Sequence, residues 1–238
     1  MGIVAALAAE ARTLGPLPPA RPAAAGSIDI RTLPDGNLLV MSGMGGEAAR
    51  QAALALVAAG ARGLLSFGLA GGLDPALAAG AVLLPRAVTD GDGTVHTAHV
   101  PWRERLAALQ SARGPAPIVE GVLLSLAQPL TTPLSKSQAR ARTGAVAVDM
   151  ESFAIASVAI ERGVKFAVAR VVVDTAADRV PRCVLEATDP RGAVSYLRLV
   201  SGLIRRPPDI LALLGLARRY RPAMRSLRRL ARPGLNLS

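Results

Sequence analysis

Continuous apolar runs that alternate with helix-like stretches constrain the fold of this chain more than any other feature. Such runs occupy residues 2–7, 63–67 and 166–173, with Arg170 as the one charged residue among them. A strand that is apolar at every position needs cover on both faces of its sheet. Further strands are predicted over 27–32, 37–41, 81–88, 118–126 and 146–148, and helices over 47–59, 102–111, 135–142 and 151–162. The pattern predicts an α/β three-layer sandwich, with a central mixed, largely buried sheet flanked by helices.

Composition narrows the class of protein further. The chain has 238 residues, which is enough for one large domain with a buried core. We expect a catalytic domain over 1–200, followed by a basic, partly amphipathic tail over 201–238. The single cysteine, Cys183, excludes an internal disulfide and a cysteine-based metal cluster. With no uncharged apolar run of 18 residues, a membrane-spanning helix is not predicted, and we expect a cytoplasmic protein.

Polar residues and glycines gather where the predicted strands end. Glu10, the glycine-rich stretches 43–46 and 68–72, the pair Asp149 and Glu151, and Asp174 all occupy such positions. In α/β folds, ligands bind outside the carboxyl ends of the strands. The arrangement therefore predicts a cleft at this edge of the sheet.

Two of these features also have purely structural explanations. The glycines at 43–46 let the backbone approach an anion at a helix N-terminus, but they can equally serve only the turn. Glu151 can cap the helix that it precedes. That reading leaves Asp149 unexplained, because a buried carboxylate needs hydrogen-bond donors. The vicinal hydroxyls of a sugar are one such partner.

Three segments resemble one superfamily, that of the purine nucleoside phosphorylases and methylthioadenosine/S-adenosylhomocysteine nucleosidases. Val-Asp-Met-Glu-Ser at 148–152 resembles its ribose-binding signature. Gly-Leu-Ala-Gly-Gly at 68–72 resembles its Gly-Ser-Ala-Gly-Gly loop, with Leu69 in place of serine. Residues 170–178 resemble its Arg-x-x-Ser-Asp-x-Ala-Asp segment, with Val173 in place of serine. The resemblance spans about residues 1 to 200.

The resemblance implies a role for each matching residue. Glu151 would accept hydrogen bonds from the ribose hydroxyls while Met150 packs against the sugar. Asp174 would protonate purine N7, which requires that burial raise its pKa. Glu10 would activate water. The remaining expected substrate-binding residues are Arg170, Gly43, Gly45, Leu69, Gly71 and Val173. Alternatively, Asp174 caps a loop and Arg170 pairs internally.

The sequence does not decide which nucleophile attacks the sugar or which aromatic side chain stacks on the base. Glu10 favours hydrolysis, whereas phosphate held near Arg170 and the glycines would give phosphorolysis. No cofactor is implied, and phosphate is the one co-substrate considered. His96 and His99 lie in a polar loop that is expected to be solvated and to reach the nucleoside. No metal site is predicted there, because a metal site needs three or four ligands in a defined geometry. The family's adenine-stacking Phe is missing, so Phe153 or Phe67 would have to replace it.

The chain is similar to a narrower group, the hopanoid-associated phosphorylases or adenosylhopane nucleosidases. That resemblance implies release of adenine from adenosylhopane in hopanoid biosynthesis. Leu69, Leu130 and Val173 would suit such an apolar 5′ substituent. The alternatives are a methylthioadenosine/S-adenosylhomocysteine nucleosidase and a non-catalytic nucleoside-binding protein at a membrane surface. A homodimer is expected from the family.

The C-terminal tail carries most of the positive charge. Residues 198–238 hold ten arginines and a single acid, Asp209, and so account for nine of the eleven net charges. We expect Pro222 to separate two helices, the second with Met224, Leu227, Leu230 and Ala231 on one side and arginines on the other. Such a helix suits an anionic membrane, here the inner membrane. Nucleic-acid binding and a solvated tail are the alternatives, although no nucleic-acid module is recognised.

Overall fold

The computed structural model describes the chain except for residues 20–27, 113–116, 181–208, 232–234 and 236–238. Within the described residues, one mixed sheet has eleven strands: β1 (Gly2–Ala5), β2 (Ile30–Thr32), β3 (Leu38–Met41), β4 (Gly63–Gly72), β5 (Val82–Leu83), β6 (Ala87–Thr89), β7 (Val95–Thr97), β8 (Ile118–Val119), β9 (Val122–Ser125), β10 (Ala147–Asp149) and β11 (Lys165–Asp174). The helices are α1 (Ala8–Ala11), continued by the 3-10 turn Arg12–Leu14, then α2 (Gly46–Ala58), α3 (Val100–Ser111), α4 (Pro133–Thr143), α5 (Ser152–Glu161) and α8 (Asp209–Ala231). The predicted α/β sandwich with a mixed sheet is confirmed.

Strand β4 is the centre of the sheet. It runs parallel to β1 and to β11, and its last residues pair antiparallel with β10. The C-terminal half of β4 therefore lies between β11 and β10. Glu10, Glu151, Arg170 and Asp174 lie on, or close to, these strands and β1.

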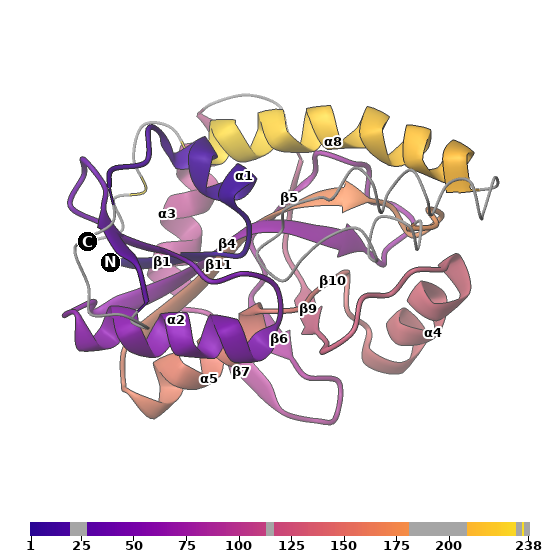
Figure 1. Cartoon of the computed structure of the whole chain (residues 1–238). Coiled ribbons are helices and arrows are strands. Elements are labelled where there is room, and N and C mark those ends of the chain that lie inside the picture. Colours follow the sequence, from indigo (N-terminus) through magenta and orange to yellow (C-terminus); the bar gives the residue numbers. More distant parts are fainter. Residues whose placement is uncertain (20–27, 113–116, 181–208, 232–234, 236–238) are drawn as a thin grey trace.

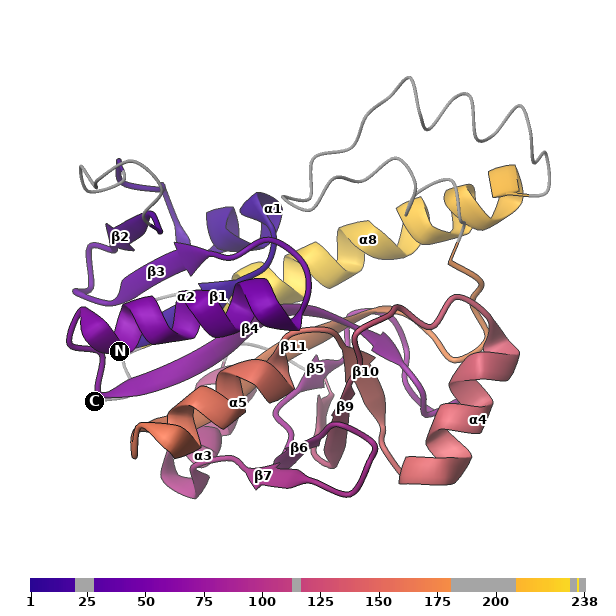
Figure 2. The same ribbon diagram turned by 60° about the horizontal axis from the view of Figure 1, so that its bottom comes forward.

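Helices cover both faces of the sheet, as Figures 1 and 2 show. Helices α2 and α5 pack on one face through a cluster of small and branched apolar side chains that includes Ala52, Leu56 and Ile155. Helices α3 and α8 cover the other face, where Trp102 and Leu227 join a second cluster. The central strands are largely apolar because neither face of the sheet meets water.

Three sequence expectations about strands were wrong in detail. Residues 68–72, expected to form a loop, continue β4 because they pair with β11 on one side and with β10 on the other. The strand expected at 81–88 is divided around Pro85, which has no backbone N–H to donate to a ladder. The strand expected at 118–126 is divided at Gly121, whose φ is +148°.

The expectation of two helices in the tail was also wrong. Helix α8 is a single helix with Pro222 inside it. Met224, Leu227 and Leu230, expected to face a membrane, are instead buried in the second apolar cluster. Without α8, part of that face of the sheet would be exposed to water, so its burial accounts for the apolar side of the helix. The domain boundary expected near residue 200, like Cys183, lies outside the described residues.

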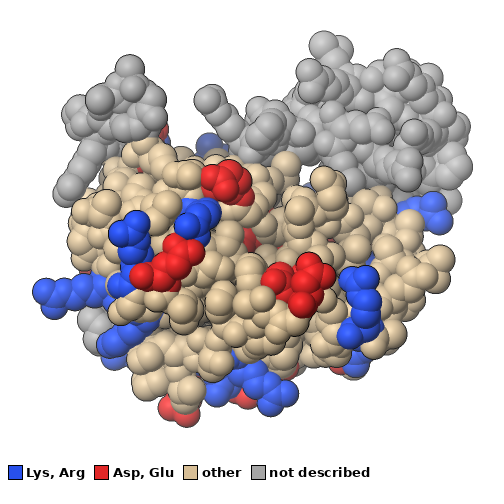
Figure 3. All heavy atoms as spheres, turned by 90° about the horizontal axis from the view of Figure 1, so that it is seen from below, with Lys and Arg blue, Asp and Glu red and all other residues tan. Residues whose placement is uncertain are grey.

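The charges of the molecule are distributed differently on its two faces. On the face formed by α2 and α5, acidic and basic side chains are interspersed among uncharged ones (Figure 3), and Arg50 pairs with Glu161 at 2.9 Å. On the opposite face, α8 presents exposed Arg218, Arg221 and Arg225. None of the helices that the structure describes is both long and apolar enough to cross a membrane.

Candidate active site

Glu10 is a buried carboxylate held by backbone amides. It lies in α1, directly after β1, and its Oε2 accepts a hydrogen bond from the Leu7 amide at 3.0 Å. Its Oε1 accepts a second hydrogen bond from the Leu69 amide of β4 at 2.9 Å. A Cβ on Gly68 would lie 2.5 Å from the same oxygen, so only glycine permits this approach. The carboxylate is therefore fixed against β4.

Burial raises the pKa of Glu10 to about 7, while the nearby Arg170 guanidinium and the two backbone hydrogen bonds oppose the rise. A carboxylate of this pKa exchanges protons near neutral pH, as a general base for water must. The geometry and the pKa both suit the role that the resemblance implies for Glu10.

Arg170, on β11, has several buried partners, and only 1% of its surface is exposed. Its Nη2 lies 3.0 Å from Oδ2 of Asp149 and 3.2 Å from Oε2 of Glu151. It also donates to the Ser66 hydroxyl at 2.9 Å and to the Leu69 carbonyl at 3.0 Å. Two buried carboxylates thus share one cation, and internal pairing of Arg170 is what the structure shows.

The two carboxylate oxygens of Glu151 have different partners: one contacts Arg170, and the other contacts the glycine turn before α2. Its Oε1 accepts a hydrogen bond from the Gly45 amide at 3.0 Å, and Gly45 has φ +98°. Burial raises the pKa of Glu151, and Arg170 lowers it. Glu151 stands at the N-cap position of α5 but makes no side-chain cap bond there, so the capping explanation is wrong. Each carboxylate oxygen has two acceptor sites, which leaves room for sugar hydroxyls.

Asp174 ends β11 and pairs with a residue that the sequence analysis missed, Lys136 of α4. The Lys136 ammonium donates to Oδ2 of Asp174, to the Thr175 carbonyl at 2.7 Å and to the Asp178 carbonyl at 3.3 Å. Burial raises the pKa of the Asp174 carboxyl, and the Lys136 charge opposes that rise. Asp178 in turn accepts from the Thr175 amide at 2.8 Å, which closes the turn after β11.

One signal in the sequence points to Lys136. The chain has 28 basic residues, and only Lys136 and Lys165 among them are lysines. Lys136 is therefore one of two places where the chain carries a compact ammonium in place of a guanidinium. The amphipathic pattern of the segment 135–142 hid it, because lysine is ordinary on a helix surface.

Some of the predicted residues interact directly, whereas others are related only by their positions along neighbouring strands. Glu10 and Glu151 both lie in the electrostatic field of Arg170. Asp174 follows Arg170 by four residues along β11, about 13 Å at the usual rise of a strand. A Cβ on Gly71 of β4 would lie 3.2 Å from Asp174, just as Gly68 adjoins Glu10. The two groups of acids thus lie along one pair of strands.

Most of the contacts that the structure gives for the other predicted residues are made by their backbone atoms. Gly43 has φ +82° and donates its amide to the Ala6 carbonyl at 3.1 Å. Leu69 supplies an amide to Glu10 and a carbonyl to Arg170, so the absent serine hydroxyl is not needed for these bonds. Side chains of Leu69 and Val173 pack beside the cluster under α8 and are partly buried. The Met150 carbonyl lies beside Gly46.

The aromatic and histidine expectations need correction. Phe67 is fully buried in the core and is not available to stack on a base. Phe153 stacks on His96 with ring centroids 4.8 Å apart, and His96 contacts the Ser157 hydroxyl at 3.1 Å. His96 belongs to β7 and not to a loop as expected, whereas His99 lies in the short connection between β7 and α3; both are half-buried. Among the described residues, no three His, Cys, Asp or Glu side chains are grouped to hold a metal.

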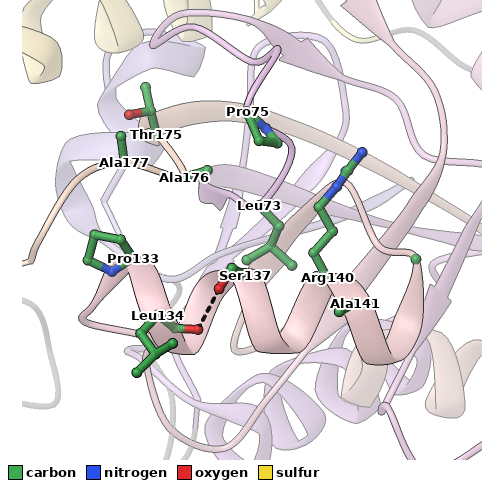
Figure 4. Close-up of a pocket in the computed structure, with 11 residues that line it drawn as sticks. Leu73, Pro75, Pro133, Leu134, Ser137, Arg140, Ala141, Thr175, Ala176 and Ala177 are labelled. Atoms are coloured by element: carbon green, nitrogen blue, oxygen red, sulfur yellow. Dashed lines mark hydrogen bonds between the residues drawn. The ribbon is translucent and has the colours of Figure 1, made fainter.

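A cavity of about 730 Å³ lies between α4 and the turn that follows β11. Figure 4 shows α4 as one wall, with Leu73, Pro75 and residues 175–177 around the rest. Arg140 of α4 reaches its rim and pairs with Asp74 at 2.9 Å. None of the predicted site residues lines this cavity, although Thr175 and Lys136 connect it with Asp174.

Solved structures share this fold at low sequence identity. A 5′-methylthioadenosine/S-adenosylhomocysteine nucleosidase from Neisseria meningitidis, in complex with methylthio-immucillin-A, is 17% identical, with a TM-score of 0.69 over 96% of this chain and 95% of that one. The Helicobacter pylori enzyme with butyl-thio-DADMe-Immucillin-A is 20% identical, with a TM-score of 0.67 over 74% and 85%. The Colwellia psychrerythraea enzyme with adenine is 24% identical, with a TM-score of 0.66 over 85% and 93%.

The sequence comparisons agree with the fold. No curated protein matches the chain significantly. A family model described as the phosphorylase superfamily matches residues 1–204, a range that includes Arg170, the three buried acids around it and the Lys136–Asp174 pair. The extent of that match, together with the shared fold, shows that the chain belongs to the phosphorylase superfamily.

Proposed function

We propose that the protein cleaves the N-glycosidic bond of an adenine nucleoside. The observation that carries this proposal is the set of buried acids beside the C-terminal halves of β4 and β11, with Glu10 and Glu151 near Arg170 and Asp174 at the end of β11. Arg170 connects the first two acids, and Asp174 lies four residues further along the same strand. Glycines 68 and 71 let both carboxylates lie against the strand.

Each acid has a step in the proposed reaction. Asp174 donates a proton to N7 of the purine, so the base leaves as a neutral molecule when the C1′–N9 bond breaks. Glu151 accepts hydrogen bonds from the ribose hydroxyls and stabilises the oxocarbenium character of the sugar. Glu10 removes a proton from the water that then attacks C1′. The amide-bound Glu10, with its pKa of about 7, favours hydrolysis over phosphorolysis.

Within this class we propose adenosylhopane as the substrate, with the hopanoid group as the 5′ substituent. Support comes from partly buried Leu69, Leu130 and Val173, which are apolar where the family is often polar or aromatic. The exposed arginines of α8 support peripheral attachment to an anionic membrane through charge alone, since the apolar side of the helix is occupied. We further propose that the protein acts as a homodimer.

The alternative substrate, methylthioadenosine or S-adenosylhomocysteine, is favoured by the nucleosidases that share the fold, two of which hold 5′-thio-substituted analogues. The full chain should be assayed for adenine release from methylthioadenosine and from an adenosine carrying a long 5′ alkyl group, with and without phosphate. Faster release from the alkyl nucleoside supports the lipid substrate, and the reverse supports the alternative. A phosphate-dependent rate indicates phosphorolysis. No release from either nucleoside contradicts the enzymatic proposal and favours a nucleoside-binding protein.

A further inference from the structure

Lys136 has all three ammonium hydrogens directed at acceptors of one short segment. The acceptors are Oδ2 of Asp174 and the carbonyl oxygens of Thr175 and Asp178. Lys136 is 1% exposed, so water does not compete for these bonds. The arrangement ties α4 to the end of β11 and takes up one oxygen of the Asp174 carboxyl, leaving Oδ1 for a ligand.

The charges around Asp174 act in different directions. Lys136 on α4 is the cation in contact with it, and Asp178 is the other acid whose charge reaches it. Arg219 of α8 pairs with Oδ1 of Asp178 at 3.0 Å, which partly offsets that second negative charge. Arg140, one turn further along α4, pairs with Asp74. Lys136 is thus the principal positive charge acting on Asp174.

We propose that Lys136 is a positioning residue that makes Asp174 a stronger and better oriented acid in the reaction proposed above, on which this inference rests. When Asp174 gives the proton on Oδ1 to N7, the C1′–N9 electron pair passes to the departing base and Asp174 becomes a carboxylate. The Lys136 ammonium is already in place to stabilise that negative charge, without any rearrangement during the reaction. Lys136 itself gains and loses no proton in this step.

The test is the pH dependence of adenine release by Lys136→Met. Above the pKa of Asp174 the donor is ionised, so activity falls on the alkaline side. Removing an adjacent cation raises the pKa of a carboxyl, typically by about 1–3 units. We expect the alkaline limb of kcat/KM to move up by about one unit or more, and the plateau rate to fall at least about tenfold because the acid is weaker and less well held.

Two variants act as controls. Lys136→Arg keeps the charge and should keep the alkaline limb at its wild-type position. Lys165→Met makes the same substitution at the other lysine, which is exposed at the far end of β11 and lies 5.9 Å above the Trp102 ring. It should leave both the limb and the plateau unchanged. A lower plateau in Lys136→Met with an unmoved limb would overturn the proposal, because a merely structural role predicts that result.

A second measurement does not depend on activity. NMR can follow the titration of the Asp174 carboxyl carbon in the wild type and in Lys136→Met. The signal is assigned because it is missing from the spectrum of Asp174→Asn. A higher midpoint in Lys136→Met supports the inference, and equal midpoints overturn it. If the wild type releases no adenine, the proposed function fails, while the titration still decides whether Lys136 governs the Asp174 proton. If Lys136→Met does not fold, Lys136→Gln, which keeps hydrogen-bond donors without charge, replaces it in both experiments.

Discussion

Arg170 and Glu151 form an ion pair in the interior, with Nη2 of the arginine 3.2 Å from Oε2 of the acid. The same nitrogen lies 3.0 Å from Oδ2 of Asp149. One guanidinium thus contacts two carboxylates, one at the end of β10 and one directly before α5. The charge state of Glu151, the acid expected to bind the sugar, therefore depends on Arg170 of β11.

Replacing Arg170 with methionine should destabilise the protein severely. Removing one partner of a buried ion pair costs about 3–5 kcal/mol, because the remaining charge is left without compensation. Urea unfolding would measure the loss. Arg50→Met removes an exposed ion pair with Glu161 and should change stability little. Equal effects of the two substitutions would show that the Arg170 network does not support the fold.

Glu10 should make stability depend on pH in a defined window. Its pKa is about 7 in the folded protein against 4.5 for the free group, so the native state binds more protons between these values. Stability contributed by this site is full below about pH 4.5, falls as pH rises to about 7, and is constant above that, a change of about 3 kcal/mol. The difference in unfolding free energy between wild type and Glu10→Gln, measured from pH 4 to 8, should follow this course. A difference that does not vary with pH would contradict the assignment.

The same variant should lose hydrolysis. Glutamine cannot take a proton from water, and loss of a general base typically costs about 10²–10⁴ in rate. The acid limb of the wild-type pH profile, expected near pH 7, should disappear with it. Adenine release at saturating substrate provides the measurement, and a glutamine variant with wild-type turnover would remove Glu10 from the mechanism.

Asp174→Asn should reduce adenine release by about 10²–10⁴, since an amide is not a proton donor of useful strength. Binding of a nucleoside should be weakened far less, so kcat should fall while KM changes little. Circular dichroism and thermal unfolding would show whether the variant keeps its fold. Near-normal turnover would exclude Asp174 as the acid.

Gly68→Ala should affect both stability and the Glu10 site. The added Cβ would lie 2.5 Å from Oε1 of Glu10, and relieving that overlap in a packed interior costs about 1–3 kcal/mol. Gly46→Ala is the control, because its Cβ would meet neighbours only at 3.6 Å. Unfolding measurements should show a loss for Gly68→Ala alone. Equal stability of the two variants would mean that Glu10 is not held against β4 in solution.

Helix α8 should behave as part of the folded core. Leu227 is fully buried, and its replacement with alanine should cost about 2–5 kcal/mol. Arg225 is exposed on the same helix, and Arg225→Ala should change stability by less than about 0.5 kcal/mol. If Leu227→Ala were also neutral, α8 would not be packed on the sheet, and its apolar side would be free for a membrane.

The order of strands and helices could be predicted from local patterns. Apolar runs predict a sheet covered on both faces, whatever the details of the pairing, and acids and glycines at strand ends predict the edge where a site would lie. Glu10, Glu151 and Asp174 were found in this way, because a charged residue at the end of an apolar run has few structural uses. The apolar side of the last helix was also visible, but not what it would contact.

Only the tertiary structure decided which partners these groups have. Arg170 and Glu151 are 19 residues apart, and Lys136 and Asp174 are 38 apart, so no local spacing relates them. Whether Met224 and Leu227 meet lipid or protein depends equally on which face of the sheet is left uncovered. A sequence records which side chains need a partner through burial and charge, whereas the choice among partners follows from which strands become neighbours.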